Sequence, residues 1–476
     1  MKRKILNISI IFGILIFAIV LRTYRLHAPL GDWHSWRQAD TASVAWEYVQ
    51  AGHVDLFHPR FHDVSSIPSG LDNPEGWRMV EFPLRDGIHA QLYLWFPQLG
   101  FLEWGRIISI FCSVATILLL YLIVLDISGF TAASFTALTF AILPYNMFYG
   151  RVILPEPMLV FFSILTLYTY MRHIQTGKLV WWLLSLLSLI FALLLKPTAL
   201  TILLPMWGYA YAKHHLSLGN FLYFLALPIL AIVPYFLWRR HIAAYPAGIP
   251  ASSWLFNSNG IRFKGAWFRW LFGERIGKLI LGYWGLVPLA FGFLKLGQKK
   301  TETLVYGGFV LGSLAYLAII ATGNVQHDYY QIQIMPTISI LVGVGCSYIF
   351  VLKRGWHKLF ASFFILGILA LSLALSWYEI RGYFWINNQA MVEAGLRLNA
   401  LTPTDALVIA PYQGDTAFLF QTKRRGWPIG GDIEDKIKKG ADYYITTTRD
   451  TEYNLLKTKY TLIEETEKYS IIKLMD

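Results

Sequence analysis

Residues 178–195 read KLVWWLLSLLSLIFALLL, an apolar run that ends at the pair Lys196-Pro197. An apolar stretch of about 18 residues or more has the length that an α-helix needs to cross a bilayer. Stretches of this kind recur along most of the chain. Their approximate ranges are 5–21, 105–125, 130–148, 156–172, 178–195, 197–212, 219–238, 277–294, 302–321, 331–352 and 358–378. The sequence therefore predicts a mainly α-helical fold, a polytopic transmembrane bundle of about eleven spans.

The composition is also that of a membrane protein. Of the 476 residues, 55% are hydrophobic and 15% are charged, whereas about a quarter of the residues in a soluble domain are charged. The net charge of +12 does not indicate a nucleic-acid partner, because the basic residues are spread between apolar runs and do not form one face. Cys112 and Cys346 both lie inside apolar runs, which favours core residues over a disulfide or a metal pair.

The lysines and arginines near the spans predict the orientation. A cleaved signal peptide is the alternative for residues 5–21, but this run has no small-x-small cleavage site and an uncleaved anchor is favoured. With the N-terminus in the cytoplasm, Arg151 and Lys196 are the basic residues of the short outside loops, and the inside segments hold many more. The inside residues are Lys2, Arg3, Lys4, Arg172, Lys178, Lys213, Lys295, Lys299, Lys300, Lys353, Arg354 and Lys358. We therefore expect a multi-pass protein of the inner or plasma membrane.

This orientation places residues 22–104, residues 239–276 and the chain beyond about 380 outside the cytoplasm. Residues 1–380 form the predicted transmembrane domain. Residues 381–476 are richer in charge, with helical patterns at 388–400 and 451–458 and strand-like runs at 406–410 and 443–446. The sequence predicts a small α/β extracytoplasmic domain there, for which a structural or acceptor-docking cap is the simplest interpretation.

The first outside loop, residues 22–104, holds the densest polar motif. It contains GDWHSWRQADTA at 31–42, and helical spacing continues from Asp40 to Gln50 with Gly52 as a stop. Residues 87–96 are again apolar and aromatic but too short to span. Two short helices lying in the membrane interface explain this pattern. They would hold Arg37, Asp40 and Glu81 near the membrane surface.

Three further segments place polar residues on the same side. In YGRVILPEP at 149–157, Glu156 begins a helix, as a helix cap or as a carboxylate held at the outer face. Lys196 either snorkels to water or provides a cation for a lipid phosphate. In NVQHDYYQ at 324–331, an interfacial aromatic belt explains Tyr329 and Tyr330 but not His327 and Asp328.

Basic residues also gather in one outside segment. They are Arg239, Arg240, Arg262, Lys264, Arg269 and Arg275. They suit either a phosphate clamp or contacts with lipid headgroups. The acids and bases thus converge on the outer face. A transporter would instead be expected to bury charges near the midplane, and no inverted repeat is visible.

Taken in order, these motifs resemble those of the type C glycosyltransferase superfamily, in the branch of protein O-mannosyltransferases and aminoarabinose lipid A transferases. The motifs are WRQADTA at 36–42, EFPL at 81–84, residues 151–157, Lys196-Pro197 and HDYY at 327–330. The resemblance covers residues 1–380. It implies a polyprenyl-phosphate-linked sugar donor and transfer of the sugar outside the cytoplasm to a protein, lipid or glycan acceptor.

The resemblance also assigns roles to residues. It implies Asp40 as the general base, and Asp32 as a second candidate because Arg37-Gln38 stands where the family often has an acidic pair. Glu156 matches a second family carboxylate, which binds the acceptor or a divalent metal (Mg or Mn), with Asp40 as the other metal candidate. The predicted residues for the donor phosphate and substrate are Arg37, Glu81, Arg151, Lys196, His327, Asp328, Tyr329 and Tyr330.

Elementary chemistry agrees with these roles. A carboxylate can take the proton of an acceptor hydroxyl, and Lys196, Arg151 or an arginine of 239–275 can neutralise a departing phosphate. The sequence has no glycine-rich phosphate loop, which favours a lipid-linked donor over a nucleotide sugar. Two alternatives remain: a transporter or flippase of lipid-linked sugars, and a non-catalytic membrane scaffold.

Overall fold

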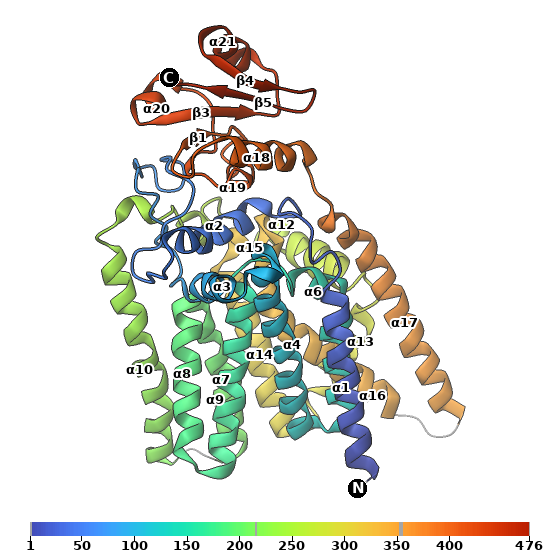
Figure 1. The fold of residues 1–476 in the computed structure, drawn as a ribbon. Helices are drawn as coiled ribbons and strands as arrows, with labels where there is room; N and C mark the ends of the chain where they lie inside the picture. Colours follow the sequence, from blue (N-terminus) through green and yellow to red (C-terminus); the bar gives the residue numbers. More distant parts are fainter. Residues whose placement is uncertain (1, 215–216, 352–355, 476) are drawn as a thin grey trace.

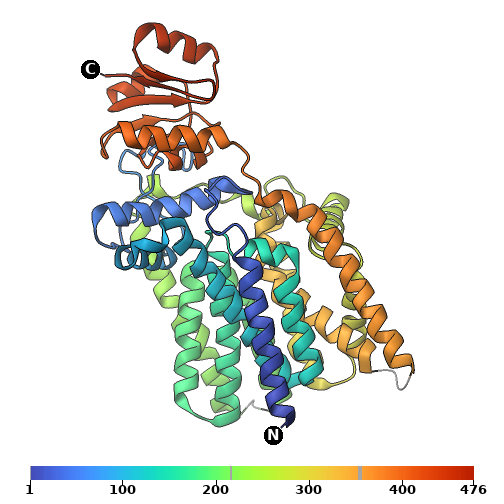
Figure 2. The ribbon, with the colours of Figure 1, turned by 45° about the vertical axis from the view of Figure 1, so that its right-hand side comes forward.

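The computed structural model describes residues 2–214, 217–351 and 356–475, so Lys353 and Arg354 lie outside the described residues. The chain forms three layers (Figure 1). Long helices run side by side in the first, short helices and loops cover one end of it, and a small sheet with its helices lies beyond them. The N-terminus and the sheet are at opposite ends of the molecule, in both views (Figures 1 and 2).

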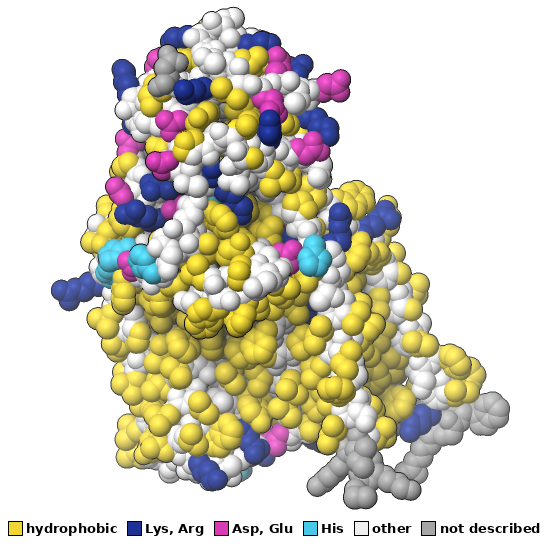
Figure 3. Space-filling model, viewed as in Figure 1, with side chains coloured by type: hydrophobic (Ala, Val, Ile, Leu, Met, Phe, Trp, Pro, Cys, Tyr) yellow, Lys and Arg dark blue, Asp and Glu magenta, His cyan; other side chains and the backbone are white. Residues whose placement is uncertain are grey.

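The helical layer contains the predicted apolar runs. Its helices are α1 (Lys2–Arg22), α4 (Phe101–Ser128), α5 (Phe130–Ile142), α7 (Glu156–Thr176), α8 (Leu179–Leu195), α9 (Leu203–Ala212), α10 (Leu218–Ile242), α13 (Leu286–Lys295), α14 (Lys300–Ile319), α16 (Met335–Val351) and α17 (Trp356–Ile380). On the face seen in Figure 3, the helices present a mostly apolar surface between their ends, whereas charged side chains gather on the sheet domain. This division of the surface is typical of a multi-pass membrane protein.

Five segments of the described residues are long and apolar enough to cross a membrane by length and composition alone. They are Phe101–Ser128, Leu218–Ile242, Lys300–Ile319, Asp328–Phe350 and His357–Leu401. Four shorter apolar helices accompany them: Leu6–Arg22, Phe130–Ile142, Leu179–Leu195 and Leu286–Lys295. The number of eleven spans stays a prediction.

Two predicted runs are interrupted by residues that are not helical. Residues 277–294 contain the end of a π-helix, η4 (Arg269–Ile280), then a turn at Gly282 with φ 50°, and then most of α13. Glycine adopts such a positive φ without strain, so the turn splits the apolar run. Residues 130–148 are divided at Pro144, where Leu143 is extended and the short helix α6 (Pro144–Tyr149) begins. The residue before a proline disfavours the α conformation, which explains the break.

Close helix contacts hold the bundle together. A Cβ added at Gly308 in α14 would lie 2.6 Å from backbone atoms of Pro205 in α9. Buried arginines fasten the helix ends: Arg22 donates to the carbonyl of Ala141 at 2.9 Å, and Arg106 donates to the carbonyl of Leu26 at 2.5 Å. These guanidinium groups satisfy backbone oxygens that would otherwise be unpaired in an apolar setting.

The covering layer contains both predicted interfacial helices. Helix α2 (Ser35–Ala51) begins five residues earlier than expected and ends at Gly52 with φ 71°, and α3 (Leu84–Trp95) covers the second apolar stretch. The other short elements are η1 (Pro97–Leu99), η2 (Pro197–Ile202), η3 (Pro246–Gly248), α11 (Trp254–Asn257), α12 (Gly265–Phe268), α15 (Ala321–Gln326), η5 (Asp328–Ile334) and η6 (Arg381–Phe384). This layer supplies most of the polar side chains that converge above the helices.

The C-terminal region forms a five-stranded mixed sheet in the order β2-β1-β3-β5-β4. Its elements are α18 (Gln389–Leu401), β1 (Leu407–Ile409), α19 (Ala417–Gln421), β2 (Gly426–Trp427), α20 (Ile433–Lys438), β3 (Ala441–Thr446), α21 (Thr451–Lys459), β4 (Thr461–Glu465) and β5 (Ser470–Lys473). Strand β1 is parallel to β2 and β3, while β5 is antiparallel to β3 and β4. Elements α18, β1, β3 and α21 confirm the α/β patterns seen in the sequence.

Candidate active site

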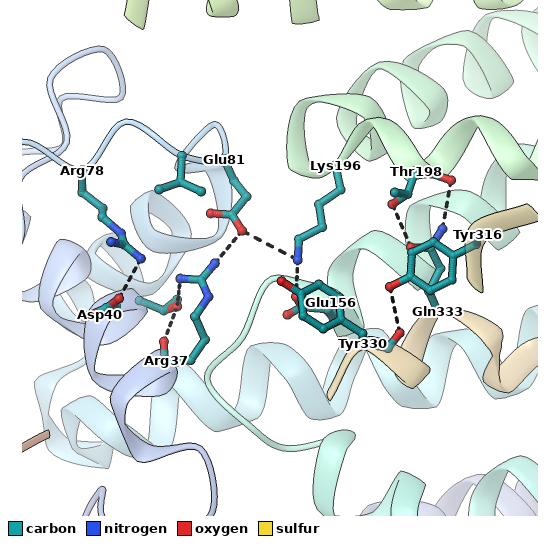
Figure 4. A network of polar contacts seen from close by, with 12 residues as sticks. Arg37, Asp40, Arg78, Glu81, Glu156, Lys196, Thr198, Tyr316, Tyr330 and Gln333 are labelled. Carbon is teal, nitrogen blue, oxygen red and sulfur yellow. Dashed lines mark hydrogen bonds and ion pairs between the residues drawn. The ribbon is translucent and has the colours of Figure 1, made fainter. Parts of the chain in front are cut away.

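A chain of alternating charges lies where the covering layer meets the helices (Figure 4). Arg37 of α2 contacts the Glu81 carboxylate with 2.5 Å between Nη2 and Oε1, and Lys196 Nζ lies 3.9 Å from the same oxygen. Lys196, at the end of α8, also forms an ion pair with Glu156, the first residue of α7. Two cations and two carboxylates from four segments are therefore adjacent, and their formal charges cancel.

Asp40 stands beside this chain in α2. Its Oδ2 atom is 2.7 Å from Nη2 of Arg78, and its Oδ1 atom accepts a hydrogen bond of 2.7 Å from the Thr416 hydroxyl. The residue is only 5% exposed. A carboxylate has about four lone-pair sites, so two partners leave it able to accept a further proton or hydrogen bond.

Asp40 lines the same pocket as Arg37 and Glu81 of the charge chain. Its lining residues are Arg37, Asp40, Thr41, Val44, Pro59, Arg78, Val80, Glu81, Phe82, Pro83, Arg85, Asp86, Pro155 and Leu195. Glu156 and Lys196 each follow one of these lining residues in the chain. At this pocket, the Asp40 carboxylate can still accept a hydrogen bond and lies close to the guanidinium groups of Arg37 and Arg78. The pocket is at the end of the apolar helices.

The charges around the pocket shift two of its acids in opposite directions. Burial acts to raise the pKa of Glu81, but the nearby cations Arg37, Lys196 and Arg78 outweigh burial and lower it. Burial raises the pKa of Asp86 to about 6, because its neighbour Arg85 compensates only part of that cost. Glu81 is thus held as an anion, whereas Asp86 binds a proton more readily than an ordinary aspartate.

Asp32, the second candidate base, has a different environment. It accepts a hydrogen bond of 2.7 Å from Gln38 and forms an ion pair of 2.9 Å with Arg151, and both charged side chains are 1% exposed. Arg151 also donates to the carbonyl of Arg25 at 3.0 Å. Asp32 is not among the residues that line the pocket. Asp32 and Arg151 thus join the first outside loop to the turn before α7.

Asp328 lies at the centre of a second cluster. Nε2 of His34 is 2.5 Å from its carboxylate, the Tyr149 hydroxyl donates at 2.8 Å, and Arg275 lies 3.7 Å away. Trp33 and Tyr383 donate to the same carboxylate. A buried carboxylate with this many donors anchors the surrounding segments, and it is poorly suited to take a proton.

Aromatic rings connect the two clusters. The Tyr330 ring lies 5.2 Å below the Lys196 ammonium, and Tyr329 stacks on Tyr330 with 4.4 Å between ring centroids. His327 in turn stacks on Tyr329 at 5.7 Å. A ring face at this distance stabilises a cation, so Tyr330 helps to hold Lys196 in place.

The structure therefore divides the residues predicted from sequence into two groups. Arg37, Asp40 and Glu81 line the pocket, and Lys196 and Glu156 adjoin it through the ion pairs of Lys196, with the Tyr330 ring beneath Lys196. Asp32, Arg151, His327 and Asp328 belong to neighbouring clusters. Of the six basic residues of 239–275, Arg275 alone has an ion pair with a predicted site residue among the described residues, through Asp328.

Comparison with known proteins finds a family model that matches part of the chain and solved structures with a similar fold. Residues 94–238 match the family described as "Dolichyl-phosphate-mannose-protein mannosyltransferase". The solved structure of ArnT from Cupriavidus metallidurans bound to undecaprenyl phosphate superposes over 99% of this chain and 98% of its own, with a TM-score of 0.64 and 12% identity. Its apo state gives a TM-score of 0.65, also at 12% identity and with the same coverage.

The chain has the type C glycosyltransferase fold. A further match with this fold is the Archaeoglobus fulgidus oligosaccharyltransferase tethered to an acceptor peptide, with a TM-score of 0.56 and 9% identity over 91% of this chain and 68% of that one. A search of curated protein sequences found no match. The resemblance stated from the motifs is confirmed at the level of the fold.

Within the type C fold, the carboxylates of this pocket do not suit a divalent metal. Across residues 2–214, 217–351 and 356–475, no group of three or more His, Cys, Asp or Glu side chains is placed to hold a metal ion. Arg78 pairs with Asp40 and Lys196 with Glu156, and these cations would compete with a metal for the same oxygens.

Three residues of the site were missed in the sequence. Arg78 lies three residues before the EFPL motif, and its position in that loop is the signal that could have found it. Asp86 stands in the first turn of α3, where a carboxylate reads as an ordinary helix-terminal residue. Thr416 lies 376 positions from Asp40, and no local pattern marks it.

Proposed function

We propose that this protein is a membrane glycosyltransferase that transfers a sugar from a polyprenyl-phosphate donor to an acceptor outside the cytoplasm. The observation that carries the proposal is the pocket shared by Asp40, Arg37 and Glu81 at the end of the apolar helices. A lipid-linked donor could keep its chain among the helices while its phosphate and sugar reach this polar pocket. The type C fold and the match of residues 94–238 support the same reaction class.

In the proposed reaction, Asp40 is the general base. It takes the proton of the acceptor hydroxyl, the hydroxyl oxygen forms a bond to the anomeric carbon, and the bond from that carbon to the phosphate oxygen breaks. The polyprenyl phosphate leaves with the electron pair. Because phosphate is already a good leaving group, a carboxylate held by Arg78 and Thr416 is a sufficient base.

Arg37 and Lys196 are the proposed cations for the donor phosphate. Glu81 and Glu156 hold these two side chains in place before the donor arrives, and Tyr330 supports Lys196 from below. Cations that are already oriented stabilise developing charge without a cost of reorganisation at the moment of reaction. The acceptor side is assigned to the part of the pocket lined by Asp86 and Arg85.

The orientation is part of the proposal. The link between α7 and α8, with Lys178, lies at the same end of the bundle as the N-terminus, opposite the pocket (Figure 1). An excess of basic residues marks the cytoplasmic side. The pocket and the C-terminal domain are therefore assigned to the extracytoplasmic side.

The test is release of polyprenyl phosphate by purified protein in detergent, with a polyprenyl-phosphate sugar and a panel of acceptors. We expect release by the native protein, and loss of at least about 100-fold in Asp40→Asn. Asp55→Asn is the matched control, since Asp55 lies exposed in the same loop and caps its own turn. A donor that stays intact after incubation with native protein would contradict the proposal. If the reconstituted protein also moves this donor between vesicle leaflets, it is a flippase instead.

A further inference from the structure

The C-terminal domain is fastened to the first outside loop by its own backbone. Gly426 of β2 donates to the carbonyl of His62 at 2.8 Å, and Val64 donates back to the carbonyl of Gly426 at 2.9 Å. The loop therefore adds a short extended segment to the edge of the sheet. Arg425 donates to the carbonyl of Pro74 at 2.7 Å, which secures the same edge.

A second attachment is an aromatic cage. The Lys423 ammonium lies 3.9 Å from the ring centroid of Trp46 in α2, 4.9 Å from that of Phe101 in α4, and 4.7 Å from that of Phe420 in its own domain. Cation–π contacts of this kind stabilise a partly desolvated ammonium. Through Lys423 the C-terminal domain thus contacts both α2 and the start of α4.

These attachments place one polar side chain directly on the proposed base. Thr416 directly precedes α19, which packs on α2, and the residue is buried. Its Oγ1 atom is 2.7 Å from Oδ1 of Asp40 and 3.1 Å from the carbonyl oxygen of Trp36. A hydroxyl has one proton, and the shorter, charge-assisted bond to the carboxylate is the stronger of the two.

We propose that the C-terminal domain is part of the active site, and that Thr416 is the positioning residue through which it acts on Asp40. Arg78 fixes Oδ2 and Thr416 fixes Oδ1, so the two contacts together set the plane of the carboxylate. Without Thr416 the carboxylate is free to rotate about its last bond. This inference rests on the proposed function, because it assigns Asp40 the role of base.

The loss of Thr416 should affect kcat and KM differently. A misdirected base lowers kcat by roughly tenfold, while KM for the lipid donor changes by less than about twofold because Arg37 and Lys196 are untouched. A general loss of packing would lower the amount of folded protein and would not produce this split.

The experiment compares Thr416→Val and Thr416→Ser in the full-length protein. Valine keeps the shape and removes the hydroxyl, so kcat falls while KM for the lipid donor stays close to its native value. Serine keeps the hydroxyl, so kcat returns towards its native value. If the valine variant does not fold, Thr416→Ala makes the same comparison, because a smaller side chain cannot clash.

A double variant separates this inference from the proposed function. In an Asp40→Asn background, Thr416→Val should cause no further loss, since both changes act through the same carboxylate. Native kcat in Thr416→Val would overturn the positioning role while leaving the proposed function intact. Full activity in Asp40→Asn would overturn the proposed function itself.

Discussion

Replacement of Lys196 by Met removes the ammonium that forms an ion pair with Glu156. The Glu156 side chain is 3% exposed, and its Oε2 atom has no hydrogen-bond partner within the described part of the chain. Breaking a buried pair by removal of one partner costs about 3–5 kcal/mol, since the remaining charge is left uncompensated. We therefore expect Lys196→Met to lower the midpoint of thermal unfolding in detergent and to abolish most sugar transfer.

The single variant does not separate stability from function, but a double variant does. Lys196→Met with Glu156→Gln removes both charges, so most of the lost stability should return. If Lys196 stabilises the departing phosphate, activity stays about 100-fold below that of the native protein, which corresponds to roughly 3 kcal/mol of transition-state stabilisation. The readouts are thermal unfolding and release of polyprenyl phosphate by the same preparation.

An exposed ion pair provides the matched control. Lys278 and Glu379 are 3.2 Å apart at the same end of the bundle, and both side chains are partly exposed. Lys278→Met should change stability by less than about 1 kcal/mol, as is usual for exposed pairs. Recovery of both stability and activity in the double variant would refute the reasoning, because Lys196 would then be a structural partner of Glu156 only.

Three further outcomes are expected. Asp32→Asn leaves Arg151 buried without its partner and should cost about 3–5 kcal/mol in thermal stability, while the protein that remains folded keeps its activity per molecule. Loss of activity at native stability would make Asp32 catalytic instead. Burial raises the pKa of Glu47 to about 7, so the native state binds a proton that the unfolded state has lost between about pH 4.5 and 7. Protonated Glu47 thus stabilises the fold at low pH, and this contribution disappears as the pH rises through 7. Glu47→Gln should raise the free energy of unfolding at pH 8 by on the order of 3 kcal/mol and leave it unchanged at pH 4. Melting curves at the two pH values will test this. Gly308→Ala should destabilise the bundle by about 1–3 kcal/mol, because its Cβ would lie 2.6 Å from backbone atoms of Pro205. Gly307→Ala should not destabilise it, because no atom lies within 4 Å of the new Cβ. Equal melting temperatures for the two variants would contradict the close approach of α9 and α14.

The features that sequence predicted well are those encoded in short stretches. Apolar length alone located most helices of the bundle, and Pro157, which suits a first helical turn, marked the start of α7. The exception at 277–294 has a physical reason. Hydropathy averaged over that run treats the turn at Gly282 as part of a helix, although a positive φ ends the helix regardless of how apolar its neighbours are.

The pairing of charges could not be predicted in the same way. The ion pairs Arg37–Glu81, Arg78–Asp40 and Lys196–Glu156 each join segments that are distant in sequence, so no short window of the chain contains both partners. Asp328 shows the consequence. As part of HDYY, Asp328 was predicted to bind the lipid-linked sugar. In the structure, side chains from four other segments, among them His34, Tyr149 and Tyr383, contact its carboxylate instead. Side-chain type indicated a polar site, and only the fold decided which acids are neutralised by their neighbours.

Under the proposed function, the balance of charge around the pocket determines which ion pair a donor phosphate would disrupt on binding. Arg37, Lys196, Glu81 and Glu156 sum to zero, so an added phosphate has to replace one carboxylate as the partner of a cation. Glu156 is fixed at the start of α7 and almost fully buried, whereas Glu81 is on a loop and lies 3.9 Å from Lys196. Glu81 is therefore the partner that gives way more easily.

An exchange of this kind would link donor binding to the position of the loop before α3. That loop carries Glu81 and also Arg78, the guanidinium that contacts Asp40. A phosphate that takes the place of Glu81 would shift the segment that holds one side of the proposed base. Thr416, on the other side of Asp40, lies outside that loop, in the C-terminal domain. It would still hold Oδ1 of the carboxylate while the loop responds to the donor.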